Sequence, residues 1–428
     1  MSNKKLIFAF SLILMAMSAQ AQKNVYWIHG FNDSSNFWER YRITITPDNK
    51  GEKIQWDGDF SLQENAVNVN RRIKSEGRSP SILIGHSAGG LVSRSVQKQN
   101  SNVKGIITVG TPNKGAGVAD ALTNNSLNNV AEDAISRVED ALDVGSQATA
   151  VSVTSIFTPV SKLVAILMSK GIIDVSGIAD LGQSLAKDFI EGLKKSFLAS
   201  PSTTDMLSSS TYLKNLNSSK VSVPIINIYG NENEKRLVRI ASSAYYKDEA
   251  TSVSNVNDNQ YDGKFNSIYK SALGVFTAME SIHYARGAID VLLGVFYPPY
   301  FSSSAMNFYA ASKWASVKRF VEYDVHNDWS EIIGAVHYEK KTYTTGILWW
   351  KKKHTKYVPV YEKHDGFIPN KSSMMDASMG VYVKNIEVRG VNHMEMSSHP
   401  DMNRLLKGIL FPSSSNSEYH ANFNINNN

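Results

Sequence analysis

The sequence predicts an α/β protein with a doubly wound, mostly parallel sheet. Near-continuous apolar runs rich in β-branched residues recur along the first third of the chain, and they alternate with stretches of helical periodicity. Strands of this kind are buried on both faces, because helices cover a parallel sheet from both sides. The chain is long enough for one elaborated domain or two ordinary ones.

Apolar runs in the first third of the chain predict the strands. Three of them are expected at 25–29, 81–85 and 103–109, and weaker candidates occur at 43–46 and 53–56. The order of the runs along the chain, each followed by a turn or a helical stretch, fits a sheet that is built up strand by strand.

Two helices are expected between these strands. Ser61 and Glu64 have the spacing of a capping box, in which each side chain binds a backbone N–H group of the other residue. A helical pattern of apolar residues follows at Leu62, Ala66, Val69 and Ile73. A second pattern comes after residue 87, at Leu91, Val92, Ser95 and Val96.

The strand pattern resumes late in the chain, at 221–229 and 381–388. Two long segments, 113–220 and 231–360, interrupt it, and the second is much richer in Phe, Tyr and Trp than the rest of the chain. We expect its rings to be buried in a core of their own or to line an apolar cleft. Both segments are predicted to be cap or lid insertions in one domain at 22–412.

The first residues predict export. Lys4 and Lys5 precede an apolar stretch at 6–17, and Ala19-Gln20-Ala21 has the small residues of a cleavage site. These are the parts of a signal peptide at 1–21, which is too short in its apolar core to span a bilayer. We therefore expect a secreted or periplasmic protein, cut after Ala21, with no transmembrane span in its mature part.

Composition excludes several kinds of site and partner. The chain has no cysteine, which excludes disulfides, thiolate metal sites and a cysteine nucleophile. The formal net charge of +6 falls to +4 once the two signal-peptide lysines are removed, and no basic stripe with stacking aromatics recurs. A nucleic-acid partner is therefore not expected. Residues 413–428 are rich in Ser and Asn and are predicted to form a disordered tail.

Ser87 is the candidate nucleophile. It occupies the centre of Gly85-His86-Ser87-Ala88-Gly89, directly after the apolar run Ile82-Leu83-Ile84 and before a helical pattern. A serine nucleophile needs a tight turn between a strand and a helix, and flanking glycines relieve the crowding of that turn.

Five motifs in order resemble the α/β-hydrolases, and among them the bacterial lipases and carboxylesterases. They are His29-Gly30-Phe31, the serine motif with Gly90, Gly110-Thr111-Pro112 with Gly115, Asp365-Gly366-Phe367-Ile368-Pro369, and Val391-Asn392-His393. The resemblance covers 24–112, 221–230 and 361–411. It implies the α/β-hydrolase fold, a hydrolytic activity on carboxylic esters and a Ser-Asp-His triad.

His393 is the candidate base. A serine hydroxyl becomes a good nucleophile when a histidine takes its proton and a carboxylate orients that histidine. In this fold the chain order is serine, acid, histidine. The other histidines precede the serine, lie in the inserted segments, adjoin the turn Asp365 to Pro369 (the acid turn) or lie in the tail. This leaves His393 and His399. Only His393 directly follows a predicted strand.

Asp365, in its Gly-Phe-Ile-Pro turn, is the preferred acid, and Glu232 and Glu234 remain alternatives because they follow a strand immediately. The backbone N–H groups of Phe31 and Ala88 are expected to form an oxyanion hole.

No cofactor or metal is required by this chemistry. His393, Glu395 and His399 could suggest a metal site, but Pro400 makes helical spacing doubtful. Some lipases of the family hold a structural calcium ion near the histidine loop. The sequence neither predicts nor excludes such a calcium site, because no second carboxylate can be matched to Glu395.

Trp349, Trp350 and the lysines Lys351, Lys352 and Lys353 form a second local signal. We favour a β-hairpin with one tryptophan packed inward and solvated lysines on an edge strand. The alternative is peripheral contact with a lipid surface, where tryptophan rings lie at headgroup depth and lysines meet anionic groups.

The sequence thus predicts an exported serine hydrolase that acts on ester or lipid substrates. An amidase, a thioesterase or an acyltransferase on the same machinery is the nearer alternative, since the pocket and not the fold decides the substrate. A non-catalytic surface or binding protein is the more distant one.

Overall fold

The computed structural model describes residues 23–124 apart from 32 and 47–49, residue 126, residues 200–232, scattered positions between 274 and 288, and residues 300–412 and 418–426. The predicted signal peptide, most of the two predicted insertions and Glu234 lie outside the described residues.

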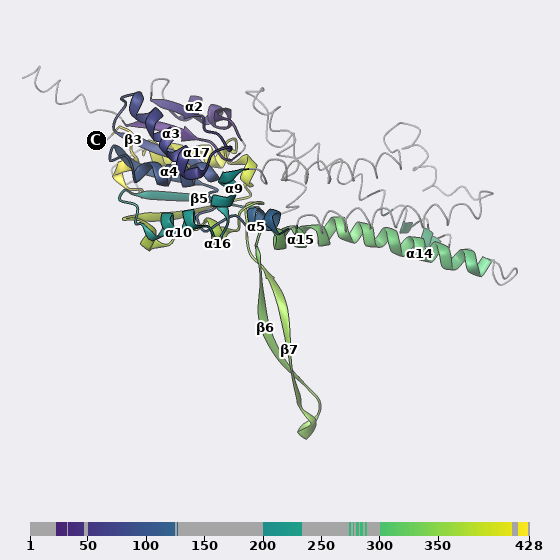
Figure 1. Cartoon of the computed structure of the whole chain (residues 1–428). Coiled ribbons are helices and arrows are strands. Elements are labelled where there is room, and N and C mark those ends of the chain that lie inside the picture. Colours follow the sequence, from purple (N-terminus) through teal and green to yellow (C-terminus); the bar gives the residue numbers. More distant parts are fainter. Residues whose placement is uncertain are drawn as a thin grey trace, which may run out of the picture.

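A six-stranded sheet forms the centre of the molecule (Figure 1). Its order is β2-β1-β3-β4-β5-β8, and every neighbouring pair is parallel. The strands are β1 (Asn24–Ile28), β2 (Gly51–Ile54), β3 (Ser81–His86), β4 (Val103–Val109), β5 (Ile225–Asn231) and β8 (Val383–Arg389). The predicted fold class is confirmed, since helices cover both faces of a parallel sheet.

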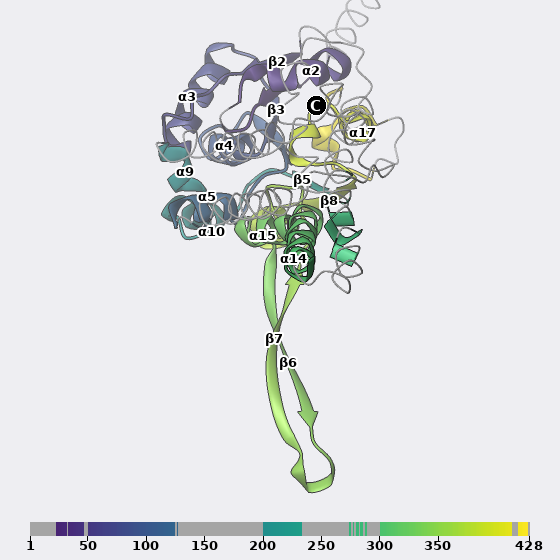
Figure 2. The same ribbon diagram turned by 90° about the vertical axis from the view of Figure 1, so that its right-hand side faces the viewer.

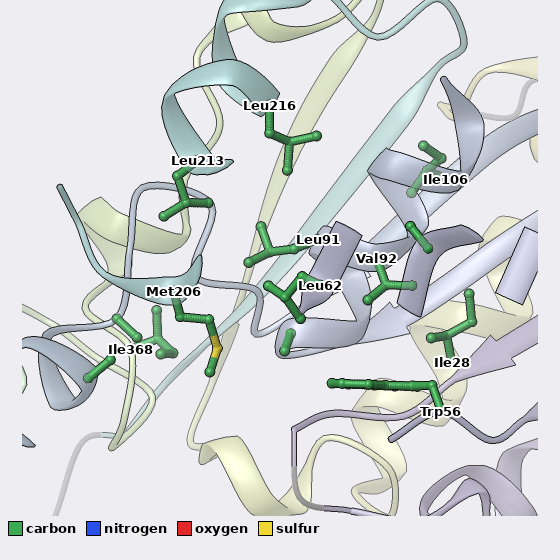
Figure 3. Close-up of a cluster of buried hydrophobic side chains, with 14 of the residues drawn as sticks. Ile28, Trp56, Leu62, Leu91, Val92, Ile106, Met206, Leu213, Leu216 and Ile368 are labelled. Carbon is green, nitrogen blue, oxygen red and sulfur yellow. The ribbon is translucent and has the colours of Figure 1, made fainter. Parts of the chain in front are cut away.

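Alternate residues of each strand enter two separate cores. Tyr26 and Ile28 of β1 face one core, whereas Val25 and Trp27 face the other. The first core is covered by α3 (Leu62–Ser75), α4 (Ala88–Gln97), α5 (Gly117–Thr123), α9 (Pro201–Met206) and α10 (Thr211–Ser218) (Figure 3). The second is covered by α2 (Glu39–Ile45), α17 (Pro400–Leu410) and the short helix η6 (Ala421–Phe423).

The capping box predicted at the start of α3 is present. The Ser61 side chain accepts from the backbone of Glu64, and the Glu64 carboxylate accepts from the backbone of Ser61 at 3.0 Å. The four apolar residues of the predicted helical face are all buried. The spacing of residues in the sequence was enough to predict this helix, because it has a single apolar face.

The weak strand prediction at 43–46 is wrong. These residues lie in and just after α2, where Tyr41 and Ile45 point into the second core and Ile43 is 57% exposed. The four-residue spacing of the two buried side chains is helical.

The described parts of both predicted insertions contribute to the main core. In the first, Met206, Leu213 and Leu216 pack beneath the sheet with α4. In the second, α14 (Tyr300–Arg319), the π-helical turn η2 (Phe320–Asp324) and α15 (Val325–Ile332) follow one another, and Trp329 of α15 reaches the same core. None of the helices in the described residues combines the length and apolar character that crossing a bilayer requires.

After α15 the chain forms a long two-stranded hairpin, β6 (Val336–Thr345) and β7 (Lys352–Tyr361), which projects away from the domain (Figures 1 and 2). The expectation that aromatic rings of this region are buried is wrong for the hairpin, whose tyrosines and tryptophans are largely exposed. The packing of one tryptophan inward is wrong as well, since Trp349 and Trp350 are 81% and 79% exposed.

Part of the predicted tail is ordered. Residues 418–426 pack on the sheet, and Phe423 and Ile425 are fully or almost fully buried. The Phe423 ring lies against β4, where a β-carbon on Gly105 would come within 2.8 Å of it. Two apolar side chains therefore outweigh the polar composition, and the prediction of disorder over 413–428 is wrong for these residues. The rest of that segment lies outside the described residues.

Candidate active site

Ser87 lies in a turn that glycines make possible. It joins β3 to α4 with φ 51° and ψ −127°, and it is the one non-glycine residue with a positive φ among those the structure describes. A β-carbon at Gly85 would lie 2.3 Å from the carbonyl oxygen of Gly89, and one at Gly89 would lie 2.2 Å from that of His29. A backbone conformation of this kind costs about 1–3 kcal/mol, which surrounding packing must offset.

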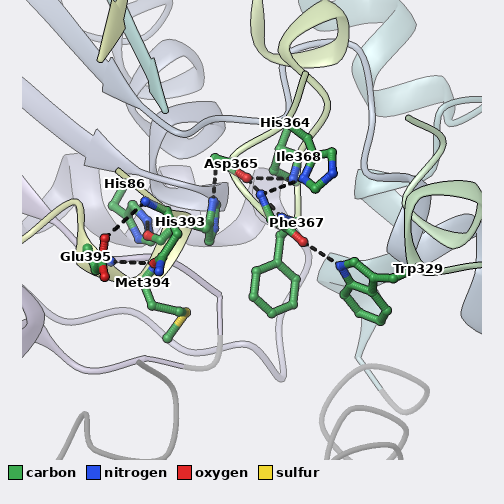
Figure 4. A network of polar contacts seen from close by, with 11 residues as sticks. His86, Trp329, His364, Asp365, Phe367, Ile368, His393, Met394 and Glu395 are labelled. Atoms are coloured by element: carbon green, nitrogen blue, oxygen red, sulfur yellow. Dashed lines mark hydrogen bonds and ion pairs between the residues drawn. The ribbon is translucent and has the colours of Figure 1, made fainter. Parts of the chain in front are cut away.

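His393 and Asp365 form a hydrogen-bonded pair (Figure 4). The Nδ1 atom of His393 lies 2.8 Å from Oδ2 of Asp365, and the two residues are 7% and 1% exposed. The other carboxylate oxygen accepts the backbone N–H groups of Phe367 and Ile368 at 3.0 and 2.7 Å. Since an ionised carboxylate only accepts, Nδ1 carries the ring proton and Nε2 is the basic nitrogen.

The Ser87 turn and this pair lie at one edge of the sheet. The Ser87 N–H group donates to the carbonyl of Val109 at 2.8 Å. A β-carbon on the next residue, Gly110, would lie 3.1 Å from His393 Nδ1 and 3.2 Å from Asp365 Oδ2. No hydrogen bond joins the Ser87 hydroxyl to His393 in the described part of the chain. Such bonds are often long before substrate binds and tighten in its presence.

The acid turn is held from two sides. The indole N–H of Trp329 donates to the carbonyl of Gly366 at 2.7 Å, and its ring packs edge-on against Phe367. Phe367 in turn lies against the His393 ring, with centroids 5.5 Å apart. His364, the residue before the acid, is buried and accepts the Gly366 N–H group at 2.9 Å. Nothing in the local sequence indicated the role of Trp329, which comes from the segment predicted to be a cap.

Glu232, the alternative acid, is buried at the end of β5, and its N–H group donates to the carbonyl of His364 at 2.8 Å. It is thus next to the acid turn. The carboxylate that binds the His393 ring, however, is that of Asp365.

The two histidines before the serine have packing contacts. His29 stacks on Trp56 with ring centroids 5.3 Å apart, and its Nε2 accepts the Trp56 backbone N–H group at 3.2 Å. His86 stacks on Phe37 with centroids 4.2 Å apart, and its Nε2 lies 3.0 Å from the His393 carbonyl oxygen.

The two residues predicted to supply the oxyanion hole follow neighbouring strands. Ile28 of β1 pairs with Gly85 of β3, so Phe31 and Ala88 come shortly after the carboxyl ends of adjacent parallel strands. Ala88 is the first residue of α4, where a backbone N–H group has no acceptor within the helix.

A buried polar network behind the serine was not predicted. Arg94 of α4 is fully buried and donates to Asn113 at 3.0 Å and to Asn217 at 2.8 Å. The Asn113 side-chain amide donates to the Asn227 side chain of β5 at 3.1 Å. It also donates to the carbonyl of Ser373, just after the acid turn, at 2.8 Å. Burial lowers the pKa of Arg94 to about 10, so the guanidinium stays charged at neutral pH. A signal was present, since Asn227 interrupts an apolar strand.

Glu395 and His399 have local roles. The Glu395 carboxylate accepts the Asn392 N–H group at 3.2 Å in a second capping box, and His399 Nδ1 caps α17 by accepting from Asp401. Within the described residues no group of three or more His, Asp or Glu side chains could hold a metal ion.

The sheet order, the strained serine turn and the bonded Asp-His pair are arranged as in the α/β-hydrolase fold. Over residues 61–181 the chain matches the PGAP1-like alpha/beta domain family. A search of curated protein sequences found no match.

Several solved structures are similar to this chain. The mature lipase BlEst2 of Bacillus licheniformis is 12% identical with a TM-score of 0.35, over 88% of this chain and 87% of that one. The esterase EaEST of Exiguobacterium antarcticum is 14% identical with a TM-score of 0.27, over 49% and 74%. An extracellular α/β-hydrolase from a Paenibacillus species is 17% identical with a TM-score of 0.26, over 48% and 76%.

Proposed function

We propose that the protein is an exported serine hydrolase that cleaves carboxylic esters through an acyl-enzyme. The observation that carries the proposal is the 2.8 Å hydrogen bond between Asp365 and His393, at the edge of the sheet where the strained Ser87 turn lies. A serine next to a histidine whose tautomer is fixed by a buried carboxylate is the arrangement that nucleophilic acyl transfer needs.

In this mechanism the Ser87 oxygen attacks the ester carbonyl carbon while Nε2 of His393 accepts the hydroxyl proton. The bond to the alcohol oxygen then breaks, and His393 gives its proton to the leaving alcohol. Water attacks the acyl-enzyme and passes a proton to His393, and that proton returns to Ser87 as the carboxylic acid is released. Asp365 keeps the ring oriented and stabilises its charged form.

The tetrahedral intermediates carry a negative oxygen, and the backbone N–H groups of Phe31 and Ala88 are assigned to bind it. Because both donors are backbone groups, side-chain substitutions at these positions test the assignment poorly. The chemistry of these steps requires no cofactor.

Labelling with a fluorophosphonate probe tests the nucleophile. Wild-type protein and Ser101→Ala, which alters an exposed serine in the turn before β4, should be labelled, and Ser87→Ala should not. Failure of the wild type to react would contradict a serine hydrolase.

A substrate panel tests the bond that is cleaved. p-Nitrophenyl esters of increasing acyl length should be hydrolysed by the wild type and not by Ser87→Ala. If amides or thioesters were turned over in a Ser87-dependent way and esters were not, the ester assignment would be wrong.

Export is tested separately. The protein recovered from the periplasm or the culture medium should begin at Gln22 on N-terminal sequencing. Recovery only from the cytoplasm with residues 1–21 attached would contradict export.

A further inference from the structure

The hairpin β6–β7 is an extended structure that pairs with no third strand in the described part of the chain. Its two ten-residue strands pair only with each other, from Val336 opposite Tyr361 to Thr345 opposite Lys352. It is anchored at its base, where the N–H group of Glu362 donates to the carbonyl of Ala335 at 2.7 Å. An isolated two-stranded hairpin is only marginally stable in water. A projection of this length therefore indicates that the hairpin has a function.

The tip of the hairpin, residues 346–351, has a defined backbone. Gly346 has a φ of +104°, and a β-carbon there would lie 2.1 Å from the carbonyl oxygen of Trp350. The N–H group of Trp350 donates to the carbonyl of Ile347 at 3.1 Å and closes a single 3₁₀ turn. The tip is therefore a tight turn of defined backbone that carries Ile347, Trp349 and Trp350.

Three large apolar side chains of the tip face solvent. Ile347, Trp349 and Trp350 are 80%, 81% and 79% exposed. The other five tryptophans of the chain, at 27, 38, 56, 314 and 329, are at most 5% exposed. Exposure of this much apolar surface at one end of a projecting element marks an interaction site.

The hairpin is strongly basic. From Val336 to Tyr361 it has one acidic residue, Glu339. The same range has six lysines: Lys340, Lys341, Lys351, Lys352, Lys353 and Lys356. The cores of protein–protein interfaces are depleted in lysine, whereas tryptophan next to lysine is typical of the interface between a membrane and water.

We propose that the hairpin tip docks on an anionic phospholipid bilayer. Trp349 and Trp350 enter the headgroup region, where an amphipathic indole ring is most stable, together with Ile347. The neighbouring lysines are attracted by the negative surface potential of the bilayer. The docking is independent of catalysis, so it does not require the proposed ester hydrolysis.

Vesicle co-sedimentation tests the proposal. The mature chain with Ser87→Ala is mixed with vesicles of phosphatidylcholine alone or with phosphatidylglycerol added, so that no lipid is hydrolysed during the measurement. Strong binding is expected only to the anionic vesicles, and high salt should weaken it because salt screens the lysine charges. Absence of binding to both kinds of vesicle overturns the proposal.

Variants separate the tip from the rest of the surface. Trp349→Ser/Trp350→Ser should weaken binding to anionic vesicles by about tenfold or more, whereas Tyr357→Ser, an exposed stem residue, should change it by less than about threefold. Equal binding by the double variant and the wild type overturns the proposal.

The charge contribution has a matched control. Lys351→Gln/Lys352→Gln/Lys353→Gln should weaken binding by about a hundredfold at low salt. The exposed domain lysines Lys74, Lys104 and Lys214, changed to Gln together, remove the same charge and should have a much smaller effect. Equal effects of the two triple variants would show that only net charge matters, and the tip would be excluded.

Tryptophan fluorescence reports the insertion directly. Because five of the seven tryptophans are buried in the protein, a blue shift on vesicle addition and quenching by brominated lipids should come from Trp349 and Trp350. Both signals should be lost in the double tryptophan variant, and their persistence would overturn the assignment.

Discussion

His86 contacts His393 directly, with Nε2 of the first 3.0 Å from the carbonyl oxygen of the second and the two rings 4.6 Å apart. The residue before the strained serine therefore supports the loop that carries the candidate base. His86 in turn stacks on Phe37, with ring centroids 4.2 Å apart. The serine turn and the histidine loop are thus joined by a ring that, in the proposed mechanism, transfers no proton.

His86 is expected to act as a positioning residue. His86→Phe keeps an aromatic ring on Phe37 but cannot hydrogen-bond to the His393 carbonyl, so the base should shift slightly. We expect kcat for ester hydrolysis to fall by about tenfold to a hundredfold with KM little changed. Steady-state kinetics check this, with His420→Phe on the exposed surface as control. If His86→Phe lowered the melting temperature but left kcat unchanged, the role of His86 would be packing alone.

Asp365→Asn should lower kcat by about 10³–10⁴-fold, because an amide can hold the imidazole in the wrong tautomer and cannot stabilise its charge. The matched control is Asp376→Asn, an exposed residue shortly after the acid turn that pairs with Lys114. Kinetics on a p-nitrophenyl ester decide the outcome. Retained activity in Asp365→Asn together with its loss in Glu232→Gln would transfer the acid role to Glu232.

Arg94→Leu should destabilise the fold by about 2–4 kcal/mol, since it leaves the buried amide oxygen of Asn113 and the half-buried one of Asn217 without their donor. Urea unfolding followed by circular dichroism measures the change. Arg71→Leu, at an exposed position of α3, should stay within about 0.5 kcal/mol of the wild type. A neutral effect of Arg94→Leu would show that the network is dispensable.

Glu39 should contribute to acid sensitivity. Its hydrogen bonds with Arg42 and Lys53 lower its pKa from 4.5 to about 2. Its stabilisation is therefore complete above pH 4.5 and is lost as the pH falls toward 2. Because the side chain is 39% exposed, solvent screening limits the effect to less than about 1 kcal/mol.

Urea midpoints at pH 7, 5 and 3 test this expectation. Glu39→Gln should lose less stability than the wild type between pH 5 and pH 3. Glu52→Gln, whose partner Arg78 is 4.0 Å away, gives the same change of charge as a control. Parallel pH profiles of wild type and Glu39→Gln would contradict the prediction.

Local spacing was enough to predict most of the sheet. The strand at 103–109 has the predicted bounds, and the Ser61 capping box is present, because each depends on residues close in the sequence. Asp365 and His393 are adjacent in space although a β-strand separates them in the chain. Their pairing was predicted from the chain order of a known family, and no single-sequence pattern would have supplied it.

The errors have a common physical origin. Whether an apolar residue is buried depends on what the rest of the chain places over it, and this cannot be read from its neighbours. One tryptophan of the pair Trp349 and Trp350 was expected to be inside and both are exposed, whereas Phe423 was expected in a solvated tail and is buried. Trp329 was missed for the same reason, because its contact with the acid turn exists only after α15 has folded onto the core.

The position of Phe423 on β4 also constrains the order of folding. Gly105 lies in a central strand synthesised early, yet the ring that covers it belongs to the last part of the chain. A contact between segments so distant in sequence forms late, because a large loop must close before it can be made. The second core therefore cannot be completed before the segment that carries Phe423 has been synthesised.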